Sequence, residues 1–155
     1  MLKKVLFTIT LCLLALFTSQ AQSTDKIQSF LDLEFNLNNN ETLKISELKG
    51  KVILFDFWHR GCYPCLKAIP DLIDLQEEFK EDLVIIGVND YDIQEDVTAH
   101  FEYKQVNYFS TYKTNDRIFR LLDVQVFPTT LLLYTKGKII YRDEGYSKAG
   151  IRKLR

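Results

Sequence analysis

The chain has 155 residues, of which 46% are hydrophobic and 26% are charged, and its net charge at pH 7 is −1. This length suffices for one hydrophobic core but hardly for two, and its 11 Phe, 8 Tyr and 1 Trp exclude a disordered chain. The near-neutral charge, with no cluster of Lys or Arg, excludes a nucleic-acid-binding protein that works through bulk electrostatics. The composition therefore indicates one globular domain and leaves its function open.

The N-terminal segment has the layout of a secretory signal peptide. Lys3 and Lys4 precede a mostly apolar run of 13 residues, and the segment ends on the small residue Ala21. A bilayer-spanning helix needs about 20 apolar residues. We therefore expect residues 1–21 to be cleaved from an exported protein, and a retained membrane anchor is the alternative.

Cleavage after Ala21 changes the charge and the cysteine content of the chain. Residues 22–155 carry 18 Lys and Arg against 21 Asp and Glu, so their net charge is −3. Cys12 leaves with the signal peptide, and Cys62 and Cys65 are then the only cysteines. The sequence thus predicts an exported, periplasmic domain over residues 22–155 whose two thiols lie three positions apart.

Hydrophobic periodicity predicts strands that alternate with helices along this domain. The expected strands cover residues 30–36, 41–45, 51–58, 83–88, 108–111, 129–134 and 138–142. The expected helices cover residues 64–80, 93–104, 116–122 and 147–155. Asn38-Asn39-Asn40 and Lys136-Gly137 are expected to form the turns of two hairpins. This order predicts an α/β fold in which a mixed sheet is flanked by helices on both faces.

The strongest chemical signal is Cys62-Tyr63-Pro64-Cys65, which lies between a buried strand and an amphipathic helix. The N-terminus of a helix favours a thiolate at Cys62, because its free backbone N–H groups and its dipole stabilise negative charge. Pro64 suits the first helical turn, where no N–H is needed. Cys65 lies one turn inside, close enough to attack a mixed disulfide at Cys62. Two such thiols can carry two electrons as a disulfide.

Three alternative roles of the cysteine pair stay open. A structural zinc site needs two more Cys or His ligands, and only His59 and His100 are available. A purely structural disulfide is possible, but its four-residue ring constrains the unfolded chain little. The third alternative is a non-catalytic scaffold with a vestigial motif.

The residues around the cysteines resemble the thioredoxin superfamily. The stretch Asp56-Phe57-Trp58, the cysteine motif and Pro70 are similar to the thioredoxin active site, and Phe127-Pro128-Thr129 is similar to its cis-proline loop. The leading hairpin and the 39-residue gap between Asn89 and Pro128 resemble exported thiol-disulfide oxidoreductases of the TlpA/ResA type. The resemblance implies a thioredoxin fold with an N-terminal β-hairpin and a strand–helix insert.

The same resemblance implies roles for individual residues. Cys62 would attack a substrate disulfide and Cys65 would resolve the mixed disulfide. Asp56 would carry the proton of Cys65, since burial raises the pKa of a carboxyl group; a hydrogen-bonded structural carboxylate is the alternative. The residues implied in substrate binding are Trp58, Tyr63, Pro64, Phe127 and a cis Pro128.

The resemblance also implies partners and a process. The expected substrates are the thiols or disulfides of other proteins, with the protein acting as a reductant in cytochrome c biogenesis or in cell redox homeostasis. A membrane thiol protein would supply the electrons. We expect a monomer, with no bound cofactor, no metal and no nucleic acid.

The chain departs from the family pattern beside the motif. Gly61 stands where the family usually has a bulky residue, which would open the surface around Cys62, and Ala68 stands where ResA-type members carry a glutamate. A cation at His59 would stabilise the Cys62 thiolate and make the disulfide more oxidising; a solvated loop residue is the alternative. Arg60 is expected to be solvated.

Two rival functions have related folds. A thiol peroxidase usually has Thr three residues before its reactive cysteine, where this chain has His59. A copper carrier would use Cys62, Cys65 and a histidine, because soft thiolates select Cu(I), but such carriers have a wider cysteine spacing.

Overall fold

The computed structural model of the protein describes residues 28–48, 50–114, 117–134 and 137–155. The expected signal peptide and Lys136 of the expected last turn lie outside the described residues. None of the helices in the described part of the chain is long and apolar enough to cross a bilayer.

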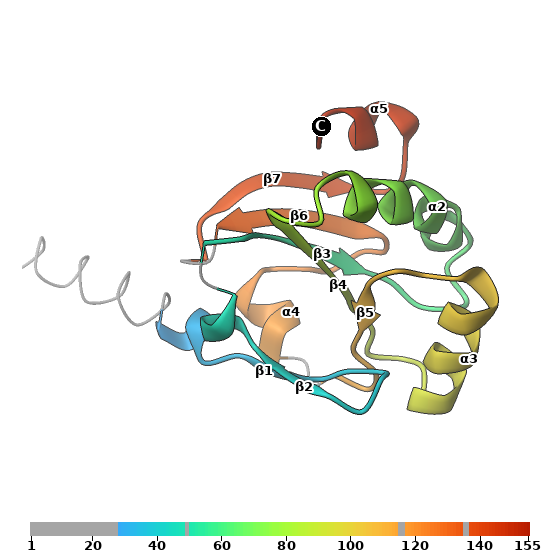
Figure 1. The fold of residues 1–155 in the computed structure, drawn as a ribbon, viewed down its shortest axis with the longest axis horizontal. Helices are drawn as coiled ribbons and strands as arrows, with labels where there is room; N and C mark the ends of the chain where they lie inside the picture. The colour runs from blue at the N-terminus through green and yellow to red at the C-terminus, as the bar shows by residue number, and fades with distance from the viewer. Residues whose placement is uncertain (1–27, 49, 115–116, 135–136) are drawn as a thin grey trace, which may run out of the picture.

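A five-stranded sheet in the order β5-β4-β3-β6-β7 forms the centre of the fold (Figure 1). Its strands are β3 (Val52–Phe57), β4 (Leu83–Val88), β5 (Phe109–Ser110), β6 (Thr129–Tyr134) and β7 (Ile139–Glu144). Strand β3 pairs in parallel with β4 and antiparallel with β6. The sheet is therefore mixed, as predicted, and its central strand is the nearly unbroken apolar one.

Helices cover both faces of the sheet, which confirms the predicted fold class. Helices α2 (Tyr63–Glu78), α3 (Gln94–Lys104) and α5 (Lys148–Arg152) place buried side chains in the core on one face. Helix α4 (Arg117–Leu121) and the hairpin of β1 (Glu34–Asn36) and β2 (Thr42–Lys44) pack on the other. The gap between β4 and β6 holds α3, β5 and α4.

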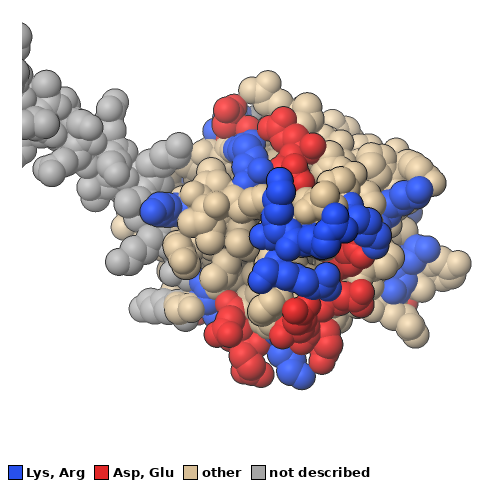
Figure 2. All heavy atoms as spheres, turned by 90° about the horizontal axis from the view of Figure 1, so that it is seen from above, with Lys and Arg blue, Asp and Glu red and all other residues tan. Residues whose placement is uncertain are grey.

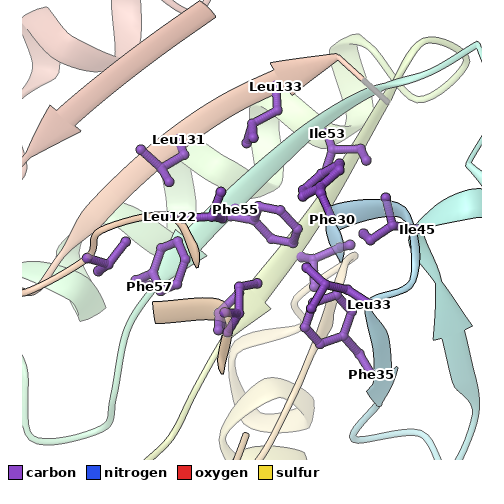
Figure 3. Packing of buried hydrophobic residues seen from close by; sticks show 14 of the residues in the cluster. Phe30, Leu33, Phe35, Ile45, Ile53, Phe55, Phe57, Leu122, Leu131 and Leu133 are labelled. Carbon is purple, nitrogen blue, oxygen red and sulfur yellow. The ribbon is translucent and has the colours of Figure 1, made fainter. Parts of the chain in front are cut away.

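The core on the α4 side is rich in phenylalanine (Figure 3). The ring of Phe55 lies at the centre of this core. Its centroid lies 6.3 Å from that of Phe30, 5.9 Å from that of Phe35 and 6.1 Å from that of Phe57. Odd-numbered residues of β3 point to this side, because side chains alternate along a strand. Even-numbered residues, Asp56 among them, therefore point toward α2.

The predicted strand over residues 30–36 is wrong in its first half. Residues 28–31 form a helical turn, and only Glu34–Asn36 is extended. Phe30 and Leu33 are both buried in the same core, and a helical turn places residues three apart on one side. The following turn at residues 38–40 and the return strand are confirmed, but Ile45 starts the short 3₁₀ helix η1 (Ile45–Glu47) instead of ending β2.

The short helix α5 packs on α2 through apolar and charged side chains. Ile151 and Leu154 join the core, while Lys148 bonds to Asp71. Figure 2, seen from the side of α5, shows Lys and Arg gathered near the middle of this face with Asp and Glu beside them. Exposed ion pairs contribute little to stability, so the apolar contacts are the main anchor of α5.

A close contact between three strands holds Trp58 in place. The Trp58 Nε1–H donates to Ser110 Oγ at 2.9 Å, and the indole packs in the core on the α2 side. A Cβ atom at Gly87 would lie 2.8 Å from both of these polar atoms. Only glycine leaves room for this hydrogen bond.

Replacement of Gly87 by alanine should therefore destabilise the protein. Overpacking of this kind costs about 1–3 kcal/mol of unfolding free energy, and urea unfolding followed by fluorescence reports it because Trp58 is the single tryptophan of the chain. Ser110→Ala, which removes the hydrogen-bond acceptor without adding bulk, is the comparison variant. An unfolding free energy of Gly87→Ala within about 0.5 kcal/mol of the wild-type value would contradict the close contact.

Candidate active site

The two cysteines form a disulfide where β3 passes into α2. Cys62 and Cys65 are joined, with their Cα atoms 5.2 Å apart. Cys62 is the residue that caps the helix, and its Sγ accepts a hydrogen bond from the backbone N–H of Cys65 at 3.3 Å. The predicted position of the motif at a helix N-terminus is confirmed, with Pro64 in the first turn.

The two sulfurs differ in their accessibility. Cys62 keeps 7% of its surface exposed, whereas Cys65 is fully buried beneath the helix. Both cysteines are buried, and Cys62 is the one of the two with surface left for a substrate to contact. This asymmetry is what an attacking and a resolving thiol require.

The loop before β6 lies beside the disulfide. The bond between Phe127 and Pro128 is cis, and the carbonyl oxygen of Pro128 accepts a hydrogen bond from Gly145 N–H at 2.7 Å. Because Thr129 pairs with Phe57 at the end of β3, this loop lies at the edge of the sheet where the motif begins. Two segments more than 60 residues apart thus meet at one site.

Asp56 lies inside the protein on the same side of β3 as α2. It pairs with Gly87 on one neighbouring strand and with Thr130 on the other. Its side chain is buried, and no residue in the described part of the chain bonds to either carboxyl oxygen. Burial raises the pKa of Asp56 from 3.8 to about 7. The alternative of a hydrogen-bonded structural carboxylate does not fit this environment.

The residues that we expected to bind substrate fall into two groups. Tyr63 and Pro64 are exposed beside Cys62, and Phe127 is half-buried next to the cis bond. Trp58 instead lies in the core with 1% of its surface exposed. Its indole can support the neighbouring residues of the site, but it is too buried to contact a substrate.

The loop after β4 completes the site, although no motif in the sequence singled it out. The ring of Tyr91 lies 4.7 Å from that of His59 and 5.6 Å from that of Phe127. The turn signal at Asn89-Asp90 could have located this loop, because parallel strands end at the same edge of a sheet. Tyr91 is exposed, so the aromatic cluster of His59, Tyr91 and Phe127 faces solvent near Cys62.

Arg60 is not merely solvated, contrary to the expectation from sequence. Its guanidinium lies 2.8 Å from an Asp96 oxygen and 3.5 Å from an Asp92 oxygen, and its backbone N–H donates to Asp92. These bonds tie the loop before the motif to the loop after β4 and to α3. The expectation failed because the two acidic residues are more than 30 positions away in the sequence.

His59 covers the glycine that precedes Cys62. A Cβ atom at Gly61 would lie 3.3 Å from two atoms of the imidazole ring. The open surface expected from Gly61 is thus partly filled by a side chain from two residues earlier. The ring also contacts Phe127 at 5.2 Å, so it is packed against aromatic neighbours.

The described residues bring no three potential metal ligands together. No group of three or more His, Cys, Asp or Glu side chains in the described ranges has the spacing of a metal site. The structure offers nothing that favours the zinc or the copper alternative.

The fold and the disulfide at the edge of its sheet define a class, the thioredoxin-like proteins. Residues 22–154 match the Redoxin family, and the chain belongs to this family. The chain is 30% identical over 103 residues to thiol-disulfide oxidoreductase ResA of Bacillus subtilis (strain 168), a match that covers 66% of this chain and 58% of ResA. The chain therefore spans little more than half the length of that relative.

Two further proteins are similar over a larger share of their length. The thioredoxin-like protein YneN of Bacillus subtilis (strain 168) is 30% identical over 158 residues, with 90% of this chain and 88% of YneN covered. The structure of a thiol-disulfide oxidoreductase from Bacteroides fragilis NCTC 9343 matches with a TM-score of 0.67 at 21% identity, over 79% of this chain and 93% of that one. This structural likeness confirms the thioredoxin fold.

The raised pKa of Asp56 makes the stability of the oxidised protein depend on pH. Well below about pH 4 the carboxyl group is protonated in both the folded and the unfolded chain, so its ionisation takes nothing from the stability. As the pH rises to about 7, only the unfolded chain releases the proton, so folding loses about 4 kcal/mol, and above that pH the loss is constant.

Asp56→Asn should remove this loss, because an amide does not ionise. The unfolding free energy of the variant, relative to wild type, should rise between about pH 4 and pH 8, as measured by urea unfolding across that range. Asp82→Asn, at an exposed position, is the control and should show no such rise. Parallel curves for Asp56→Asn and wild type would show that Asp56 ionises normally.

Proposed function

We propose that the protein is an exported reductant that exchanges the Cys62–Cys65 disulfide with cysteine pairs of other proteins. The observation that carries this proposal is the disulfide itself, with some exposed surface left at Cys62 and none at Cys65. Membership of the Redoxin family and the similarity to ResA and YneN support the type of reaction. The substrate, the export and the direction of electron flow are part of the proposal.

The reaction begins with the reduced protein. The Cys62 thiolate attacks one sulfur of a substrate disulfide, a mixed disulfide forms, and the first substrate sulfur leaves as a thiolate. The helix N-terminus supports the attack, since the same backbone N–H that bonds to Cys62 Sγ stabilises its negative charge.

The second step releases the reduced substrate. The Asp56 carboxylate takes the proton of the Cys65 thiol, and the Cys65 thiolate attacks Cys62 Sγ. The bond between Cys62 and Cys65 forms, the bond to the substrate breaks, and the second substrate sulfur leaves. A pKa of about 7 suits Asp56 to this task, because such a group takes and returns a proton near neutral pH.

The substrate would lie between the motif and the cis-proline loop. Tyr63 and Pro64 offer exposed surface on one side of Cys62, and the half-buried Phe127 offers its ring on the other, while Pro128 itself is buried and would act through the shape of the loop. Trp58 would act indirectly, by supporting the residues that follow β3. We assign these roles by analogy with the family and by their position around the exposed sulfur.

Export and the supply of electrons complete the proposal. The N-terminal signal sequence would direct the protein to the periplasm, where a membrane thiol protein would reduce the pair again. Cysteines of exported proteins, including those that receive haem in cytochrome c biogenesis, would then be its substrates, and the protein would act as a monomer.

Substitution of each cysteine tests the order of the two steps. In a Cys12→Ala background, which leaves only the two active-site thiols, Cys62→Ser should abolish exchange with a disulfide-bonded protein substrate. Cys65→Ser should instead accumulate a mixed disulfide at Cys62, visible by non-reducing electrophoresis and mass spectrometry. Exchange at the wild-type rate by Cys62→Ser would overturn the mechanism.

The reduction potential of the pair tests the direction of electron flow. Equilibration in thiol and disulfide buffers should give a value near or below about −250 mV, as expected of a reductant. A value near about −120 mV would mark an oxidant and overturn the proposed direction while leaving the exchange reaction intact. The reduction potential of His59→Ala, measured in the same buffers, reports how much the His59 ring over Gly61 changes the potential of the pair.

A further inference from the structure

Three side chains on the α2 side of the sheet, those of Asp56, His100 and Tyr108, have a buried polar atom without a partner among the described residues, and Asp56 and Tyr108 are the two that are buried as a whole. Neither carboxyl oxygen of Asp56 nor the hydroxyl of Tyr108 has a hydrogen bond among the described residues. Both side chains are almost fully buried. A buried polar group without a partner costs free energy, and folded proteins rarely leave one unpaired. Each of the two groups therefore needs a hydrogen-bond partner.

The strand register places the two residues on the same face of the sheet. Asp56 pairs with Gly87, and Gly87 pairs with Ser110, so these three residues form one row across β3, β4 and β5. Tyr108 lies just before β5, and its side chain packs in the core on the same face. Gly87 contributes no side chain to the row.

Tyr108 also shares its surroundings with the buried cysteine. Tyr108, Cys65 and Trp58 belong to one hydrophobic cluster, in which the ring of Tyr108 lies 5.4 Å from that of Phe101. Burial raises the pKa of Tyr108 well above 10.0, and the negative charge of Asp56 raises it further. The phenol thus keeps its proton at every pH at which the protein works, and it remains a hydrogen-bond donor.

We propose that Tyr108 is a positioning residue for Asp56, and that its hydroxyl donates a hydrogen bond, through one buried water molecule, to the charged carboxylate. This inference rests on the proposed function, in which Asp56 accepts a proton. The proton moves from Cys65 Sγ to the Asp56 carboxylate, and Tyr108 keeps its own. The bond stabilises the carboxylate before the transfer and weakens after it, so Tyr108 sets the pH at which Asp56 becomes a base.

Other groups near Asp56 do not supply this stabilisation. From β4 and β6 the facing residues are Gly87 and Thr130, which carry no charge, and from α2 the titratable neighbour is Cys65 itself. His100 on α3 contacts the Trp58 ring, but burial and then Lys104 and Arg60 lower its pKa, so it is neutral near pH 7. Two hydroxyl groups remain as possible donors, those of Thr130 and Tyr108, and the Tyr108 hydroxyl is the one that is buried without a partner.

The direct test is the titration of the Asp56 carboxyl carbon, followed by ¹³C NMR in the oxidised full-length protein. Tyr108→Phe keeps the ring and removes only the hydroxyl, and it should raise the Asp56 midpoint by about 1 pH unit. Tyr112→Phe, at a half-buried tyrosine of the same cluster, is the matched control and should leave the midpoint unchanged. An unchanged midpoint in folded Tyr108→Phe overturns the inference.

The pH profile of exchange provides the second readout. Tyr108→Phe should move the alkaline rise of the exchange rate upward by the same amount, and it should have no effect on this profile in an Asp56→Asn background. An equal shift in that background would mean that Tyr108 acts on the structure and not through Asp56.

The two proposals can fail separately. Absence of exchange by the wild-type protein would refute the proposed function, whereas the carboxyl titration needs no substrate and still decides the coupling. If Tyr108→Phe does not fold, the Cζ resonance of Tyr108 in the unmodified protein replaces it. That resonance should follow the Asp56 titration, and a flat response between about pH 5 and pH 9 overturns the inference.

Discussion

The site depends on the pairing of β3 with a strand on each side. Because β4 lies parallel to β3 and β6 antiparallel to it, the end of β3, the end of β4 and the start of β6 lie at the same edge of the sheet. The disulfide, the loop that carries Tyr91 and the cis bond before Pro128 are brought together at this edge. The alternation of side chains along β3 decides which face each residue occupies. It places Phe55 in the core on the α4 side and Asp56 on the α2 side.

The buried carboxyl group at Asp56 is a cost to stability that the fold does not offset. No ion pair or hydrogen bond from the described residues accompanies it, and its pKa lies far above the ordinary value for that reason. An apolar residue at this position would suit the surrounding core better. A buried group with a strongly shifted pKa is typical of a functional site, and Tyr108 is the donor that we propose for its charged form.

The surface around Cys62 shows how the chain departs from its family. Gly61 leaves space before the first cysteine, and the His59 ring occupies part of that space. The ring is held by aromatic contacts to Tyr91 and Phe127, and its loop is tied down by the ion pairs of Arg60. The surface beside Cys62 is therefore lined by aromatic rings and is only partly open.

The sequence by itself determined most of the order of the elements and the cysteine pair at a helix N-terminus, because periodicity and motif spacing are local properties of the chain. The proline loop was expected from the resemblance to the thioredoxin superfamily. Only the tertiary structure decided that Trp58 is buried, that residues 28–31 turn as a helix and that Arg60 is paired. It alone also placed Tyr91 beside His59, and Tyr108 in the cluster beneath the disulfide. These features depend on which strands are neighbours and on their register, and neither can be derived from spacing along a single chain.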